Sequence, residues 1–228
     1  MQNYNGIFGF IYLLASWFMR LSVTNFLWFV LNIPVTIVVW TYLINDEGTH
    51  IYALPLVVLL PLLFYPASAA LFAMARDWMR DEEHDSLLKM YVAYLRSNYR
   101  TSFVSGLIWT LLWSIWILDF RFFAENNDLL ATVFSILGIL LVVMNIHFLS
   151  MIVHYEMTIR ERFFNSFYMT VGRPGVTVIT ALIVSFIIYI ASTLWFVIIF
   201  FAGSLIATIS FYLFYRSYLK IRQEACNI

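Results

Sequence analysis

Long apolar runs without charged residues alternate with short polar segments along this chain. A helix needs about 20 mostly apolar residues to cross the hydrocarbon core of a bilayer. The runs of that length predict spanning helices over residues 22–43, 51–74, 101–118, 129–154, 176–193 and 196–215. We therefore expect an all-α fold, a polytopic transmembrane helix bundle with six spans that forms a single membrane domain over residues 1–228.

The last two predicted spans come from one unbroken apolar run between Val176 and Tyr215. This run is about twice as long as one span, and a single helix of that length would extend far beyond a hydrocarbon core roughly 30 Å thick. We therefore predict two helices joined by a tight turn between Ser192 and Trp195.

Residues 1–20, which precede the first predicted span, are rich in aromatic side chains. Such a segment is typical of a helix that lies along the membrane surface, so we predict an interfacial N-terminal helix. The segment lacks a basic n-region and a small-residue cleavage site. We therefore expect it to be retained, not removed as a signal peptide.

The few charged residues are distributed asymmetrically. Charged residues make up only 11% of the chain, whereas soluble domains carry about 25%. If both termini lie in the cytoplasm, six spans place all but one, Arg121, of the 13 Lys and Arg residues on the cytoplasmic side. A five-span alternative would put Arg216, Lys220 and Arg222 outside. The positive-inside rule therefore favours six spans with both termini in the cytoplasm.

The predicted cytoplasmic hairpin segments, residues 77–100 and 155–175, both carry amphipathic patterns. Asp77 precedes Arg80 by three residues, a spacing that suits an ion-paired continuation of the second span. Asp85 or Ser86 can cap a following amphipathic helix, and the second segment is rich in Phe and Tyr. These amphipathic cytoplasmic helices are either interfacial anchors or a docking surface for another protein.

Several stretches carry a family resemblance. The first span reads NFLWFVLNIPVT, and the second ends in YPASAALFAMARDWMR, where Phe72, Arg76, Trp78 and Arg80 form a Phe-x3-Arg-x-Trp-x-Arg pattern. Together with YLRSNYRTS and RERFFNSFYMTVGRPG, they resemble the YesL family of small bacterial membrane proteins. Members usually occur with genes for carbohydrate uptake and polysaccharide breakdown. The resemblance implies a multi-pass protein of the bacterial plasma membrane beside an oligosaccharide ABC importer, and it defines no activity.

The leading functional hypothesis is an auxiliary or regulatory subunit of such an importer, with the permease subunits and membrane lipid as partners. It rests on the resemblance, on the aromatic amphipathic segments and on the lack of an energy-coupling motif. The residues expected to contact the partner are Arg76, Trp78, Arg80, Phe164 and Phe167.

A second hypothesis is a stand-alone small secondary transporter or channel for a sugar-like solute. Polar groups within spans are costly and so mark candidate sites, which makes Pro61, Asn145 and His147 a possible polar intramembrane site. Pro61 could mark a broken helix at a transport site, although many spans tolerate proline. His147 and His154 are seven residues apart, about 10 Å by helical rise, too far to bind one ion together without unwinding.

Motifs for chemistry are missing from the sequence. It contains no Walker A loop, no HExxH pair, no nucleophile elbow and no EAA-type permease loop. Cys226 is the single cysteine, so no disulfide or cysteine-based metal site forms within one chain. We therefore expect no enzyme activity, no catalytic residues, no cofactor, no metal and no nucleic-acid partner.

Overall fold

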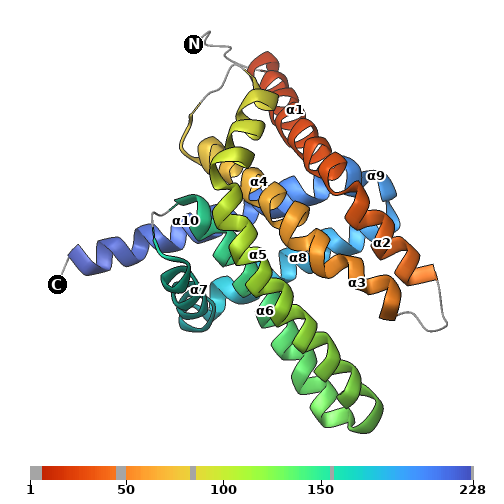
Figure 1. Ribbon diagram of the computed structural model, residues 1–228. Helices are drawn as coiled ribbons and strands as arrows, with labels where there is room; N and C mark the ends of the chain where they lie inside the picture. The colour runs from red at the N-terminus through yellow and green to blue at the C-terminus, as the bar shows by residue number, and fades with distance from the viewer. Residues whose placement is uncertain (1–6, 45–49, 83–85, 155–156, 227–228) are drawn as a thin grey trace.

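The computed structural model describes residues 7–44, 50–82, 86–154 and 157–226, and its regular elements in these ranges are all helices (Figure 1). Six helical stretches among the described residues are long and apolar enough to cross a membrane. They are Phe8–Leu31, Leu54–Met79, Leu87–Asn126, Asp128–His154, Pro174–Thr193 and Trp195–Lys220. The prediction of an all-α, six-span membrane protein is therefore confirmed.

The first span differs from its predicted limits. Helix α1 (Ile7–Leu31) runs without interruption through the expected boundary between residues 1–20 and 22–43, and α2 (Ile33–Ile44) follows a break at Asn32. The break lies just before Pro34, whose ring lacks an N–H and clashes with the preceding turn. No helix-breaking residue occurs near Arg20, so the aromatic N-terminal segment forms one helix with the start of the span.

The second span contains a π-helical turn. Helix α3 (His50–Leu59) continues through η1 (Leu60–Phe64) into α4 (Tyr65–Met79). Helix α4 is the central helix, because nearly all of its side chains are buried. Small residues on α4 allow the neighbouring helices to approach closely; the buried ones are Ala67, Ser68, Ala69, Ala70, Ala73 and Ala75.

Helices α5 (Leu87–Asn126) and α6 (Asp128–His154) form a long antiparallel hairpin, whose tip projects away from the other helices in Figure 1. Ser86 caps α5, as predicted, by accepting a hydrogen bond from the Lys89 amide. We expected a separate surface helix within residues 77–100. The structure shows that this segment forms the first part of α5, because no residue breaks the helix between it and the span.

The C-terminal half contains α7 (Ile159–Gly172), α8 (Pro174–Thr193), α9 (Trp195–Val197), η2 (Ile198–Ala202) and α10 (Gly203–Cys226). A capping box between Thr158 and Glu161 starts α7. The chain reverses at Leu194, which confirms the predicted turn between the last two spans. Figure 1 shows α8 and α10 crossing behind α4 and α5.

Candidate functional site

A polar network at the end of α4 joins three helices. Arg76 donates from Nε and Nη2 to Asp77 Oδ1, at 3.0 and 2.8 Å, and from Nη1 to the carbonyl oxygen of Val153 on α6. The Tyr94 hydroxyl on α5 donates to Asp77 Oδ2. Asp77 is fully buried. Arg76 therefore ties α4 to α6, which leaves its guanidinium engaged inside the bundle.

The other residues of the family pattern lie in different environments. Trp78 is only 5% exposed, and its ring packs edge-on against Trp17 of α1 with 6.0 Å between the centroids. Arg80 is half-exposed and pairs with Glu82 at 3.3 Å. Of the three predicted contact residues in this segment, Arg80 is therefore the most exposed, while the Arg76 side chain is only partly exposed.

Helix α7 carries the other two predicted contact residues on an exposed face. Phe164 is 51% exposed and Phe167 is 49% exposed, and Tyr168 and Val171 are exposed beside them. At the edge of this face, Phe163 stacks on Trp109 of α5 at 5.2 Å and packs on Phe148 of α6 at 4.5 Å. Two buried aromatic contacts thus hold α7 while its outer aromatic face stays open.

Asn25 supplies the polar contacts of the second π-helical turn. Its Nδ2 donates to the carbonyl oxygens of Ile198 and Ile199, each at 2.8 Å, and its Oδ1 accepts from the Ser204 amide at 2.8 Å. A π-helical turn leaves backbone groups without their usual α-helical partners. The sequence analysis assigned Asn25 no role. The feature that could have indicated one is a polar Asn side chain within an apolar span, which is costly in a membrane unless it is hydrogen-bonded.

A cavity of about 460 Å³ lies among α1, α4, α5, α6 and α10, and Asn145 lines it. Asn145 Nδ2 donates to the Tyr65 hydroxyl at 2.8 Å, and Trp28 Nε1 donates to Ser68 Oγ at 3.0 Å. The remaining lining is mainly apolar. The polar groups at its wall are therefore paired with one another.

Pro61 and His147 do not join Asn145 in one site. Pro61 packs against Gly106, where an added Cβ would lie 2.9 Å from Pro61 Cα. His147 is buried and faces Phe214 of α10, with 6.3 Å between ring centroids. Asn145 and His147 are two residues apart and so point to different sides of α6. Within the described ranges, no group of three His, Cys, Asp or Glu residues could hold a metal.

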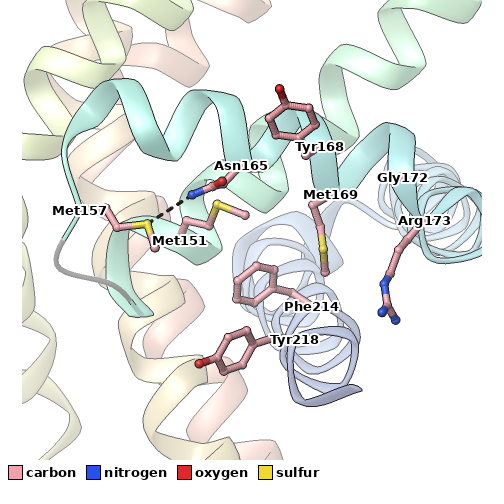
Figure 2. Close-up of a pocket in the computed structure, with 9 residues that line it drawn as sticks. All are labelled: Met151, Met157, Asn165, Tyr168, Met169, Gly172, Arg173, Phe214 and Tyr218. Atoms are coloured by element: carbon pink, nitrogen blue, oxygen red, sulfur yellow. Dashed lines mark hydrogen bonds between the residues drawn. The ribbon is translucent and has the colours of Figure 1, made fainter. Parts of the chain in front are cut away.

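A second cavity, of about 560 Å³, lies between the end of α6, α7 and α10 (Figure 2). Its lining residues are Met151, Met157, Asn165, Tyr168, Met169, Gly172, Arg173, Phe214 and Tyr218. Asn165 Nδ2 lies 3.4 Å from Met157 Sδ and holds the chain before α7 against that helix. Sequence reasoning did not identify this cavity, because its walls come from three segments that no local pattern connects.

Comparisons with known proteins agree with the sequence pattern. A family model described as "Protein of unknown function, DUF624" matches residues 21–120. The chain is 23% identical over 215 residues to the "Uncharacterized protein YesL" of Bacillus subtilis (strain 168), which covers 92% of this chain and 90% of the relative. No solved structure matches at a significant level. The family model's match contains Asn25, Arg76, Asp77 and Tyr94, and the two comparisons together support membership of the YesL family.

Proposed function

We propose that this protein is an auxiliary or regulatory membrane subunit that packs beside a carbohydrate ABC importer. The proposed role is non-catalytic and belongs to the bacterial plasma membrane. The genomic setting of the YesL family supports the importer as the partner. The observation that carries the proposal is the outer face of α7, where Phe164 and Phe167 are exposed on a helix that Phe163 anchors to α5 and α6.

The contact surface proposed here is the α7 face, defined as Phe164, Phe167, Tyr168 and Val171. Aromatic side chains on a rigid support are typical anchors of protein interfaces, because they bury large areas at little cost in side-chain entropy. The half-exposed Arg80 can add a polar contact at the edge of the interface with the partner. Arg76 and Trp78 act in this proposal as supports of the bundle, since both are engaged inside it.

Affinity purification in mild detergent, at native expression, tests the proposal. The wild-type chain should recover the importer's permease subunits, and the double variant Phe164→Ser/Phe167→Ser should lose most of them. A matched control is Phe122→Ser/Leu129→Ser, which removes two apolar side chains at the α5–α6 tip that are more exposed than the tested pair, and which should retain the permease. Recovery of the wild-type chain alone would contradict the proposal.

A second candidate function is solute transport by this chain alone. The observation that favours it is the cavity of about 460 Å³ that Asn145 and Tyr65 line beside the two π-helical turns. Flux of labelled oligosaccharide into vesicles that contain only this protein tests it. The transport model predicts flux that Asn145→Leu reduces, and vesicles without flux would remove the model.

A further inference from the structure

The cavity of about 460 Å³ among the spans has walls that suit a hydrocarbon ligand. Most of its lining residues are aliphatic, and five aromatic side chains add large apolar contact areas. These aromatic residues are Trp28, Phe64, Tyr65, Phe72 and Trp113. The lining residues that the structure describes include no Lys, Arg, His, Asp or Glu. An ionic ligand would find no counter-charge among them, so these walls favour an uncharged molecule.

The wall of this cavity continues to the outer surface of the bundle. Ile117 is 44% exposed and Ile198 is 38% exposed, and both line the cavity. Both residues belong to candidate membrane spans, whose outer surface faces hydrocarbon in a bilayer. The cavity volume falls within the roughly 300–1,000 Å³ typical of small-molecule sites. A small apolar molecule can therefore enter from the membrane interior.

One polar pair on the wall keeps an unused donor and an unused acceptor. Asn145 Nδ2 donates to the Tyr65 hydroxyl oxygen at 2.8 Å, and the two residues are 8% and 2% exposed. Among the described residues, no group donates to Asn145 Oδ1 and no group accepts from the Tyr65 hydroxyl. An alcohol fits both positions, because its hydrogen donates while its oxygen accepts. A carbonyl group could use only the Tyr65 hydroxyl.

Two irregular helical turns form parts of the same wall. Leu60 and Phe64 belong to η1, and Ile198 and Ala202 belong to η2. Such turns are rare and occur frequently at functional sites. Their meeting at one cavity, beside a buried polar pair, indicates a binding site and not a packing defect.

We propose that this cavity binds a membrane-soluble alcohol, which is a hydrocarbon molecule with one hydroxyl group. The ligand hydroxyl donates to Asn145 Oδ1 and accepts from the Tyr65 hydroxyl. The hydrocarbon body lies against the aromatic walls. This inference is independent of the importer proposal and of the transport model, because binding from the membrane needs neither a partner protein nor flux.

Binding of tritiated farnesol to the full-length protein in detergent tests the inference. The competitors are unlabelled farnesol, farnesyl methyl ether and farnesyl phosphate, which share one hydrocarbon chain. The ether keeps an acceptor oxygen and lacks the hydroxyl hydrogen, whereas the phosphate adds negative charge. We expect farnesol to compete about fivefold more strongly than the ether, because it makes one more hydrogen bond. Farnesyl phosphate should be the weakest competitor.

Substitution of Asn145 separates the hydroxyl contact from the hydrocarbon contacts. Asn145→Leu removes the acceptor Oδ1, so it should lower the affinity for farnesol to that for the ether. The affinity for the ether should stay unchanged, which shows that the variant is folded and that its cavity is open.

Substitution of Tyr65 removes the donor that both compounds use. Tyr65→Phe should therefore weaken farnesol and the ether alike. The matched control is Tyr91→Phe, which removes another buried hydroxyl. The Tyr91 hydroxyl donates to the Ala67 carbonyl, and neither residue lines the cavity, so this variant should bind both compounds like the wild type.

A further pair of variants tests the cavity without changing a polar group. Ala202 lines the cavity from η2, so Ala202→Phe should weaken farnesol and the ether at least fivefold. Ala131→Phe adds the same ring at a half-buried alanine of α6 outside the lining, and it should leave both affinities unchanged.

Three results would overturn the inference. The first is equal competition by farnesol and its ether in the wild-type protein, since this would leave no role for the hydroxyl. The second is stronger competition by farnesyl phosphate than by farnesol, since this would assign the site to an anion. The third is an equal loss of farnesol binding in Ala202→Phe and Ala131→Phe, since this would place the ligand elsewhere.

Discussion

Asn25 satisfies the backbone of a helix that lies 173 residues away in the sequence. Its amide donates to two carbonyl groups of η2 and accepts from the amide that follows this turn. A buried backbone group that loses its partner costs about 1–3 kcal/mol. In the apolar interior of a membrane bundle, one side chain thus secures the irregular start of the last span.

We expect Asn25→Leu, which has a similar volume, to lower the free energy of unfolding by about 1–3 kcal/mol, because three backbone groups lose their partner. Thermal unfolding in detergent measures the change. Asn126→Leu is the control, since the Asn126 amide bonds only within its own helix at the exposed end of α5. An unchanged melting temperature in Asn25→Leu would show that the η2 backbone needs no side-chain partner.

At the scale of elements, the α5–α6 hairpin depends on one glycine. A Cβ added at Gly138 would lie 2.2 Å from Trp116 Cζ2, and Trp116 Nε1 donates to the Phe134 carbonyl at 3.0 Å. The Nε1 edge of the indole therefore packs directly against the α6 backbone. The close approach of these two helices requires the absence of a side chain at position 138.

Gly138→Ala should destabilise the protein by about 1–3 kcal/mol, because the indole must move from a tightly packed position. Denaturation in detergent should show the loss, and Trp116→Leu in the same chain should restore part of it. Gly172→Ala is the control, because a Cβ there meets no atom within 4 Å. Additive effects of the two hairpin substitutions would argue against direct contact.

The start of α7 should respond to pH. Hydrogen bonds from the backbone and side chain of Thr158 lower the pKa of Glu161 below its ordinary 4.5. A carboxyl group with a lowered pKa in the folded state stabilises the fold above its unfolded pKa, and this contribution is lost as the pH falls through the folded pKa. We expect faster amide exchange in the first turn of α7 below pH 4.5. Glu161→Gln should remove this pH dependence.

At the scale of the whole molecule, the number of spans follows from the lengths of apolar runs, and the turn at Leu194 follows from the excess length of the last run. The lengths of the apolar runs could not predict the limits of α1 and α5. Both helices continue beyond the apolar run without a helix-breaking residue, so the sequence does not mark where the span ends. The Asn25 contacts and the separation of Asn145 from His147 depend on which helices become neighbours. Local periodicity carries no information on that choice.

The predicted orientation leads to a labelling experiment. With both termini in the cytoplasm, single cysteines at Arg80 and Arg222 should react only after the membrane is permeabilised, because the positive-inside rule places both on the inner side. A cysteine at Arg121 should react in intact cells. Each variant is made in a Cys226→Ser background, so that the native thiol does not contribute. Labelling of positions 80 and 222 from opposite sides would exclude the six-span topology.

The π-helical turn η2 also bears on how chain length can vary in this family. A π-helical turn holds one residue more than the α-helical turn it replaces. A relative that lacks one residue within Ile198–Ala202 could therefore keep Ala207, Phe211 and Phe214 facing the bundle, with a regular turn in place of the wide one. Such a chain would have no unpaired carbonyl groups for an amide at position 25 to bind. Loss of that residue and loss of Asn25 are therefore expected to occur together.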